Sequence, residues 1–161
     1  MSTDILNISE AAALIKAGQL SPVELTEMCL SRIKAYEPEL HAFVTVTEDR
    51  ARADARKAEA EIKASGPTSP LHGIPIGLKD IIDTKGILTT CQSAHNIGNV
   101  PDTDATCAAA LDAAGTVLMG KLTTHEFADG GPSFDLPWPP SRNPWNTQRF
   151  TAGSSSGTGA A

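Results

Sequence analysis

The feature that most constrains the fold is a helical pattern that passes through one glycine directly into a buried strand. Cys107, Leu111 and Ala114 fall on one face of the predicted helix, and Gly115 ends it. Residues 116–119 form a continuous stretch that is typical of a strand covered on both faces. Because helix and strand also alternate earlier in the chain, this order predicts an α/β layered domain.

Two helices are expected near the start of the chain. The clearer one begins at residues 21–24 (Ser-Pro-Val-Glu), a capping box with proline at the first helical position. Its apolar stripe comprises Leu25, Met28, Cys29, Ile33 and Tyr36. Residues 37–38 (Glu-Pro) are expected to end it, because a residue before proline disfavours the helical conformation. A shorter helix is expected from a Ser9 cap to Gly18.

The rest of the first half continues the alternation. Residues 43–47 are rich in β-branched side chains and predict a strand, and residues 48–63 predict a helix. The thin apolar face of that helix comprises Ala51, Ala55, Ala58 and Ile62. We therefore expect a mainly helical part at 1–66 and an α/β part at 67–161, both within one domain.

Charge and cysteine content exclude several classes of protein. Lys and Arg number 13 and Asp and Glu number 19, giving a net charge of −6, and no basic block suggests a nucleic acid or an anionic membrane as partner. The chain has no long uncharged apolar run, and Met1–Asp4 lacks the features of a signal peptide. Cys29, Cys91 and Cys107 form an odd, unclustered set that is typical of reduced thiols. We therefore expect a cytoplasmic protein without a nucleic-acid or membrane partner.

Lys79 is the first candidate for chemistry, because it ends the short apolar run of residues 74–78. Burial disfavours the ammonium form of a lysine, so a buried lysine can serve as a neutral base. The alternative is a surface lysine paired with Asp80 or Asp83, and spacing alone favours that alternative.

The second candidate is the segment from Gly153 to Gly159, which contains three successive serines. It can form an active-site or anion-binding loop at a helix N-terminus, so a phosphate-binding domain is one hypothesis. A flexible linker or a cloning remnant explains the composition alone better. A pairing with Lys79 would favour catalysis, because Ser–Lys is a known nucleophile–base arrangement.

Two further motifs are interpreted as structural. Residues 115–121 match the first seven positions of a phosphate-binding loop, but Leu122 replaces the required Ser or Thr, so Lys121 is not interpreted as a nucleotide ligand. The histidines lack metal-ligand spacing, so we expect neither a metal nor a cofactor. They are His41, His72, His95 and His125.

Residues 130–145 form a long proline-rich stretch without a regular period, which a compact domain usually keeps only for function. Trp138 and Trp145 lie among its prolines and are expected to anchor it onto the core. Earlier in the chain, Asp102 and Asp104 are expected to cap the helix that follows them.

Several of these segments recur together in a recognisable order. They are LHGIPIGLKD at 71–80, DAT at 104–106, AG at 114–115, MGK at 119–121, HEFA at 125–128, RNPW at 142–145 and GSSSG at 153–157. In order and spacing this set resembles the amidase signature family of serine amidases, and residues 21–25 are similar to the family's opening. The resemblance implies an α/β fold with a mixed central sheet covered by helices, of which this chain matches the N-terminal third.

The resemblance also implies a Ser–Ser–Lys triad, whose lysine falls on Lys79 and whose middle serine, held in a non-proline cis peptide, falls on Ser154. Such a bond costs roughly 3 kcal/mol and needs rigid surroundings. The neutral lysine withdraws a proton through this serine from a nucleophilic serine, which attacks the amide carbonyl and forms an acyl-enzyme. The implied activity is hydrolysis of a small-molecule carboxamide without a cofactor.

The nucleophile of that triad has no counterpart among the 161 residues. Family spacing places it roughly two dozen residues after Ser154, on a separate loop, so Ser155 and Ser156 are not substitutes. We therefore expect an N-terminal fragment that is inactive alone, with a catalytically inactive binding or assembly module as the alternative. Its exposed sheet edge is expected to need the remainder of the domain or a second copy.

Residues 129–134 correspond to the family's substrate-pocket loop, although a structural loop explains them equally well. The substrate contacts that the resemblance implies are Gly130, Gly131, Ser133 and Phe134. Ala152 replaces a common glycine, and residues 91–93 (Cys-Gln-Ser) stand where the family often has Ala-Gly-Ser. Neither departure changes a proton carrier, and the identity of the amide is not fixed by these residues.

Overall fold

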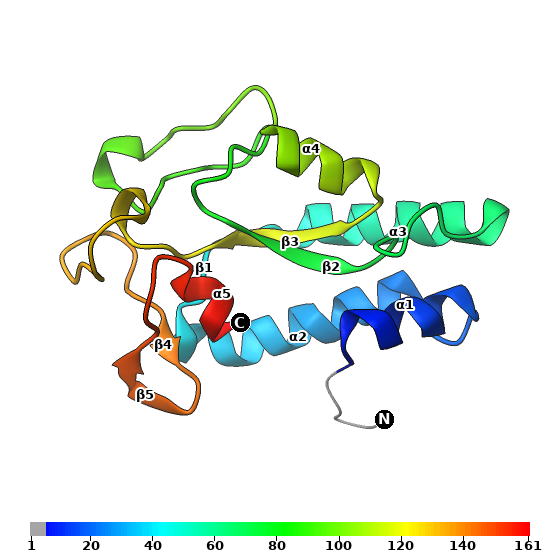
Figure 1. Ribbon diagram of the computed structural model, residues 1–161, viewed down its shortest axis with the longest axis horizontal. Helices are drawn as coiled ribbons and strands as arrows, with labels where there is room; N and C mark the ends of the chain where they lie inside the picture. Colours follow the sequence, from blue (N-terminus) through cyan, green and yellow to red (C-terminus); the bar gives the residue numbers. More distant parts are fainter. Residues whose placement is uncertain (1–5) are drawn as a thin grey trace.

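The computed structural model describes residues 6–161, in which helices and strands alternate (Figure 1). The elements are α1 (Ile8–Lys16), α2 (Pro22–Leu40), β1 (Phe43–Val46), α3 (Glu48–Ser65), β2 (Pro75–Lys79), the 3₁₀ turn η1 (Ala94–Asn96), α4 (Thr106–Ala113), β3 (Val117–Leu122), the 3₁₀ turn η2 (Glu126–Ala128), β4 (Arg142–Asn143), β5 (Asn146–Phe150) and α5 (Ser156–Ala160). Met1–Asp4, in which the sequence shows no signal peptide, lies outside the described residues. Within residues 6–161, no helix has the length and apolar character needed to cross a bilayer. The predicted α/β class is confirmed.

A three-stranded mixed sheet in the order β1-β3-β2 forms the centre of the molecule. Its middle strand, β3, is antiparallel to β1 and parallel to β2. All six residues of β3 are buried, which confirms the covered strand expected there. Lys79 at the end of β2 is in register with Leu122 at the end of β3. The segments that follow these two strands therefore begin side by side.

Helices cover both faces of this sheet. Successive side chains of β3 point in opposite directions, so they pack against helices on different faces. Val117 and Met119 pack against α3, where Ala55 is completely buried. Leu118 packs in a different cluster with Ala108 of α4. Accordingly, α4 lies on one side of the sheet and α1 and α2 lie on the other (Figure 1).

The start of α1 differs from the prediction. Asn7, not Ser9, is the N-cap: its side chain accepts the Glu10 N–H at 2.9 Å, and the Glu10 carboxylate accepts the Asn7 N–H at 2.9 Å. This capping box begins two residues earlier than expected and leaves Ser9 exposed in the first turn.

The capping box at Ser21 is present as predicted, but α2 does not end at Pro38. The helix continues to Leu40, because Pro38 lies in its last turn and the carboxylate of Glu37 satisfies backbone groups beyond the end. That carboxylate accepts the N–H groups of Ala42 and Phe43 at 3.1 and 2.9 Å. Burial raises the pKa of Glu37, because its charge loses hydration at this junction.

The helix before β3 buries a different face from the one predicted. In α4 the buried residue is Ala108, whereas Cys107 is exposed and Leu111 is half-buried. Asp104 does not cap it: the N-cap is Ala105, without a side-chain bond, and Asp104 Oδ1 instead accepts the Lys85 N–H at 2.7 Å.

The proline-rich stretch ends in a small hairpin, β4–β5, that the sequence did not predict. Trp145 lies at its turn and is 95 % exposed, so the expectation that it anchors the stretch onto the core is wrong. The side chain of Asn143 accepts the Trp145 N–H at 2.9 Å and stabilises a turn that leaves the indole outside. Trp138 is half-buried, and its carbonyl oxygen accepts a bond from Gln92.

Candidate active site

Lys79 and Ser154 meet at the carboxyl end of β2, although 75 positions separate them in the chain. Lys79 Nζ donates to Ser154 Oγ at 2.8 Å, and both residues are half-buried. The surface ion pair with Asp80 that spacing favoured is not formed, because Asp80 is buried and pairs with Lys121. An amine and a hydroxyl at this distance can exchange a proton in either direction.

The serine segment (residues 153–159) is held by the two residues that follow β3. Thr124 Oγ1 donates to the carbonyl oxygen of Ser154 at 2.7 Å, and the Gly157 N–H donates to the carbonyl oxygen of Thr123 at 3.0 Å. A Cβ at Gly157 would lie 2.5 Å from the Thr123 nitrogen, so only glycine permits this approach. Since β2 and β3 end side by side, this attachment brings the serine segment to the end of β2.

The backbone at Ser154 differs from the expectation. All peptide bonds of residues 6–161 are trans, so the cis peptide that the resemblance implied is not present. A non-proline cis bond costs roughly 3 kcal/mol and persists only where the surroundings over-determine it. Here the flanking Gly153 and Ser155 are exposed, and exposed residues have few packed neighbours to impose that geometry.

Behind Lys79 lies a buried ion pair that the sequence patterns did not reveal. The side chains of Lys121 and Asp80 are both 0 % exposed, with Nζ 3.6 Å from Oδ1. Lys121 Nζ also donates to Thr89 Oγ1 at 2.6 Å and to the Ile82 carbonyl oxygen at 2.7 Å. Burial lowers the pKa of Lys121 and raises the pKa of Asp80, because each charge loses hydration. The signal in the sequence was a lysine inside an otherwise apolar strand, which requires a buried partner.

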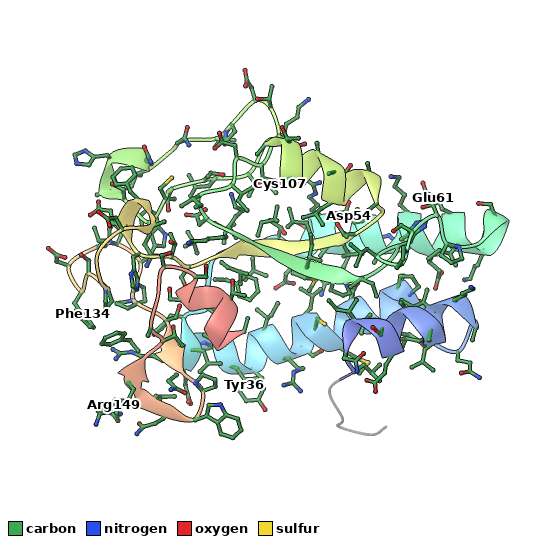
Figure 2. All side chains as sticks on the ribbon, in the orientation of Figure 1. Tyr36, Asp54, Glu61, Cys107, Phe134 and Arg149 are labelled. Carbon is green, nitrogen blue, oxygen red and sulfur yellow. The ribbon has the colours of Figure 1, made fainter. Side chains whose placement is uncertain are left out.

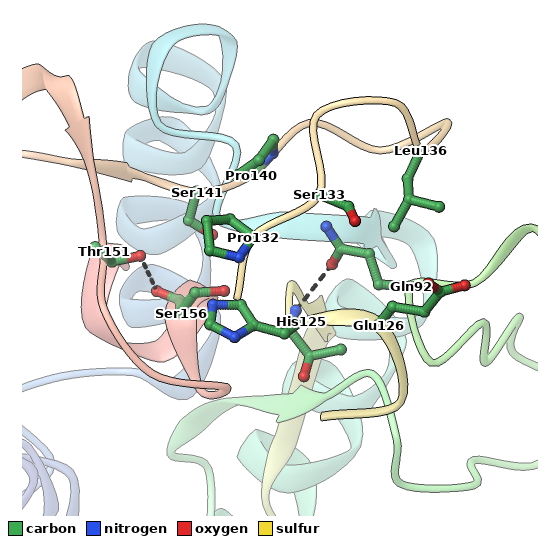
Figure 3. A pocket seen from close by; sticks show the side chains of 11 residues that line it. Gln92, His125, Glu126, Pro132, Ser133, Leu136, Pro140, Ser141, Thr151 and Ser156 are labelled. Atoms are coloured by element: carbon green, nitrogen blue, oxygen red, sulfur yellow. Dashed lines mark hydrogen bonds between the residues drawn. The ribbon is translucent and has the colours of Figure 1, made fainter. Parts of the chain in front are cut away.

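A small pocket lies beside the serine segment (Figure 3). Side chains from four parts of the chain line it, among them Gln92, Thr124, His125, Ser133 and Ser156. Its free volume of about 10 Å³ suits a single water molecule. Buried His125 supports the wall, since its Nδ1 lies 3.0 Å from the Gly130 carbonyl oxygen at the start of the predicted substrate loop.

The predicted substrate residues are not all brought together. Ser133 lines the pocket, whereas Gly130 and Gly131 are exposed on the loop beside it. Phe134 lies at the outer edge of the molecule (Figure 2), is 66 % exposed, and contacts Phe150 edge-to-face at 6.5 Å between ring centroids. In this arrangement Phe134 does not reach the pocket.

Among residues 6–161, no group of three or more His, Cys, Asp or Glu side chains is placed to hold a metal ion. Three free cysteines are Cys29, Cys91 and Cys107. Burial raises the pKa of the thiols at Cys29 and Cys91, which favours their protonated forms.

Comparison with known sequences gives one family and many relatives. The sequence model of the family described as Amidase matches residues 24–161. One relative, a subunit of the glutamyl-tRNA(Gln) amidotransferase from Roseiflexus sp. (strain RS-1), is 47 % identical over 156 residues, which cover 97 % of this chain and 32 % of that protein. The chain thus spans about a third of the length of the curated relatives that it matches.

Comparison with solved structures also gives proteins whose names describe amide hydrolysis. The native peptide amidase from Stenotrophomonas maltophilia superposes with a TM-score of 0.87 and 32 % identity, over 96 % of this chain and 33 % of that one. A fatty acid amide hydrolase superposes with a TM-score of 0.89 and 28 % identity, over 96 % of this chain and 27 % of that one. The mixed sheet and its covering helices therefore match about a third or less of a larger chain in each case.

The buried ion pair gives a stability prediction. Lys121→Met leaves the Asp80 carboxylate buried without its counter-charge, so we expect it to lower the free energy of unfolding by about 3–5 kcal/mol. Adding Asp80→Asn removes the unpaired charge and keeps an oxygen for the Thr90 N–H, so the double variant should recover part of that loss. Urea denaturation measures both, with Lys57→Met on the exposed side of α3 as control. A Lys121→Met protein as stable as the control would contradict this role.

Proposed function

Because this chain belongs to the amidase family, we propose that it supplies the lysine and the middle serine of a Ser–Ser–Lys triad that hydrolyses carboxamide C–N bonds. The observation that carries the proposal is the 2.8 Å contact between Lys79 Nζ and Ser154 Oγ. Two relatives whose names contain amidotransferase and peptide amidase support amide chemistry.

In the proposed reaction, the unprotonated amine of Lys79 accepts the proton of the Ser154 hydroxyl, and Ser154 Oγ accepts the proton of an attacking serine. The attacking oxygen bonds to the amide carbonyl carbon, and collapse of the tetrahedral intermediate breaks the C–N bond. The proton returns along the same path to the leaving nitrogen, and water then cleaves the acyl-enzyme. We place the attacking serine outside residues 1–161, on the family spacing, so that this chain contributes the two proton carriers.

The substrate in this proposal is a small carboxamide that reaches the pair from the side of the substrate loop. Ser133 and the main chain of Gly130 and Gly131 are the contacts proposed for it, from the loop itself, because the pocket of about 10 Å³ that Ser133 lines has room for a water molecule only. Phe134 then lies at the rim, beyond direct contact with the reacting group. The three free thiols support a cytoplasmic location, and the name of the amidotransferase relative, which is that of one subunit, supports a partner chain or a second copy.

Covalent labelling distinguishes the proposed amidase from the alternative, a catalytically inactive binding or assembly module. We expect a serine-directed fluorophosphonate to leave the mass of residues 1–161, expressed alone, unchanged, because no serine in them is proposed to attack. The amidase-domain protein that contains these residues should gain one adduct. An adduct on the 161-residue polypeptide would contradict the assignment of the nucleophile, and its absence from the complete domain would favour the inactive module.

The role of Lys79 has its own test in the complete amidase domain. Lys79→Ala removes the proton acceptor, so we expect kcat on a simple carboxamide to fall by about 10²- to 10⁴-fold. Because Lys79 is only half-buried, the urea midpoint should change little. Lys85→Ala, at an exposed lysine in the segment that follows β2, serves as the matched control. A Lys79→Ala enzyme with a near-normal rate would count against the proposal.

A further inference from the structure

Gln92 lies in the wall of the small pocket beside the serine segment. It is only 2 % exposed, and its side chain lies in the pocket wall together with those of Ser133 and Ser156 (Figure 3). A buried amide of this kind requires partners for both its oxygen and its nitrogen. Both atoms have them, and the partners belong to two different segments.

The oxygen of this amide holds the segment that follows β3. Gln92 Oε1 accepts the Thr124 N–H at 2.9 Å. Its nitrogen, Nε2, donates to the Trp138 carbonyl oxygen at 3.4 Å. The two bonds together fix the orientation of the amide and connect Thr124 to the proline-rich stretch.

The next link runs from Thr124 to the proposed proton carriers. The hydroxyl of Thr124 donates to the carbonyl oxygen of Ser154 at 2.7 Å, and the hydroxyl of Ser154 lies 2.8 Å from Lys79 Nζ. Gln92 therefore fixes the main chain of Thr124, and the side chain of Thr124 fixes the main chain of Ser154.

The backbone of Gln92 is in turn anchored to the residue that follows Lys79. The Gln92 N–H donates to Thr90 Oγ1 at 2.8 Å, and the Thr90 N–H donates to Asp80 Oδ2 at 3.0 Å. Hydrogen bonds therefore connect Asp80, the residue after Lys79, through Thr90 and Gln92 to Thr124. From Thr124 they lead through Ser154 back to Lys79.

The backbone conformation of residues 91–92 also indicates that the surrounding contacts hold this turn in place. Cys91 and Gln92 both have φ of 51°, a region that costs a non-glycine residue roughly 1–3 kcal/mol. A strained backbone persists where the surrounding contacts over-determine it, and the bonds of the Gln92 side chain and main chain are such contacts.

We propose that Gln92 is a positioning residue, which holds Thr124 and, through it, the backbone of Ser154 within reach of Lys79. The proposal rests on the proton-carrier roles given to Lys79 and Ser154 above. Its expected effect is on the rate of the chemical step, since misplacement of a reacting group by about 1 Å can cost two orders of magnitude.

The kinetic test uses the amidase-domain protein that contains these residues and a simple carboxamide. Gln92→Met keeps the volume but removes both hydrogen-bonding groups, so we expect kcat to fall about 10- to 100-fold, with a smaller change in KM. Gln92→Glu keeps an oxygen for the Thr124 N–H, and when it is protonated its O–H can replace Nε2 as donor to the Trp138 carbonyl oxygen, so it should retain more kcat than Gln92→Met, with the larger margin at lower pH. Gln19→Met, at an exposed glutamine before α2, is the matched control. Wild-type kcat in Gln92→Met, or equal losses in Gln92→Met and Gln92→Glu, would overturn the proposal.

A second readout does not depend on activity. In hydrogen exchange, we expect the Thr124 amide to exchange about tenfold faster in Gln92→Met than in Gln19→Met, with the Ala55 amide in α3 as an internal reference for global stability. Unchanged exchange at Thr124 would overturn the positioning role. If the wild-type enzyme hydrolyses no amide, the proposed function fails, while this exchange measurement still decides whether Gln92 holds Thr124.

Discussion

The parallel pairing of β2 with β3 is the constraint on which the rest of the site depends. Their register sets Lys79 beside Leu122, so the residues after each strand emerge at the same edge of the sheet. Thr123 and Thr124 follow β3 directly and carry the hydrogen bonds that hold the serine segment. A shift of this register by one residue would turn Lys79 to the opposite face of the sheet and away from Ser154.

Lys79 and Ser154 are half-buried, whereas the polar side chains behind them, those of Asp80, Gln92 and Lys121, are buried. The Lys121–Asp80 ion pair fixes the loop after β2, and Gln92 carries that anchoring across to Thr124. A buried polar network of this kind is costly where a member lacks a partner, and Asp80 Oδ1 has only the 3.6 Å ion contact with Lys121. The molecule thus holds the Lys79–Ser154 pair at a partly open edge on a buried polar base, and the proposed proton transfer would use this arrangement.

Local features of the fold were predictable, whereas long-range ones were not. The capping box at Ser21 and the buried strand β3 follow from spacing over a few residues, and both are confirmed. Lys79 and Ser154 are 75 positions apart and meet only through long-range packing, so spacing alone favoured a surface lysine and the family resemblance indicated the pair. Trp145 was placed wrongly because the two-residue strand β4 has no period to reveal the hairpin that carries it outward.

The central claim is that the amine of Lys79 and the hydroxyl of Ser154 share a proton, and ¹⁵N NMR of the lysine side chains tests it most directly. The measurement compares the wild type with Ser154→Ala in protein labelled at lysine Nζ, with Lys79→Arg to assign the resonance. The account predicts a changed Nζ resonance for Lys79 and unchanged resonances for the exposed Lys57 and Lys85. A Lys79 resonance that is the same with and without the Ser154 hydroxyl would contradict it.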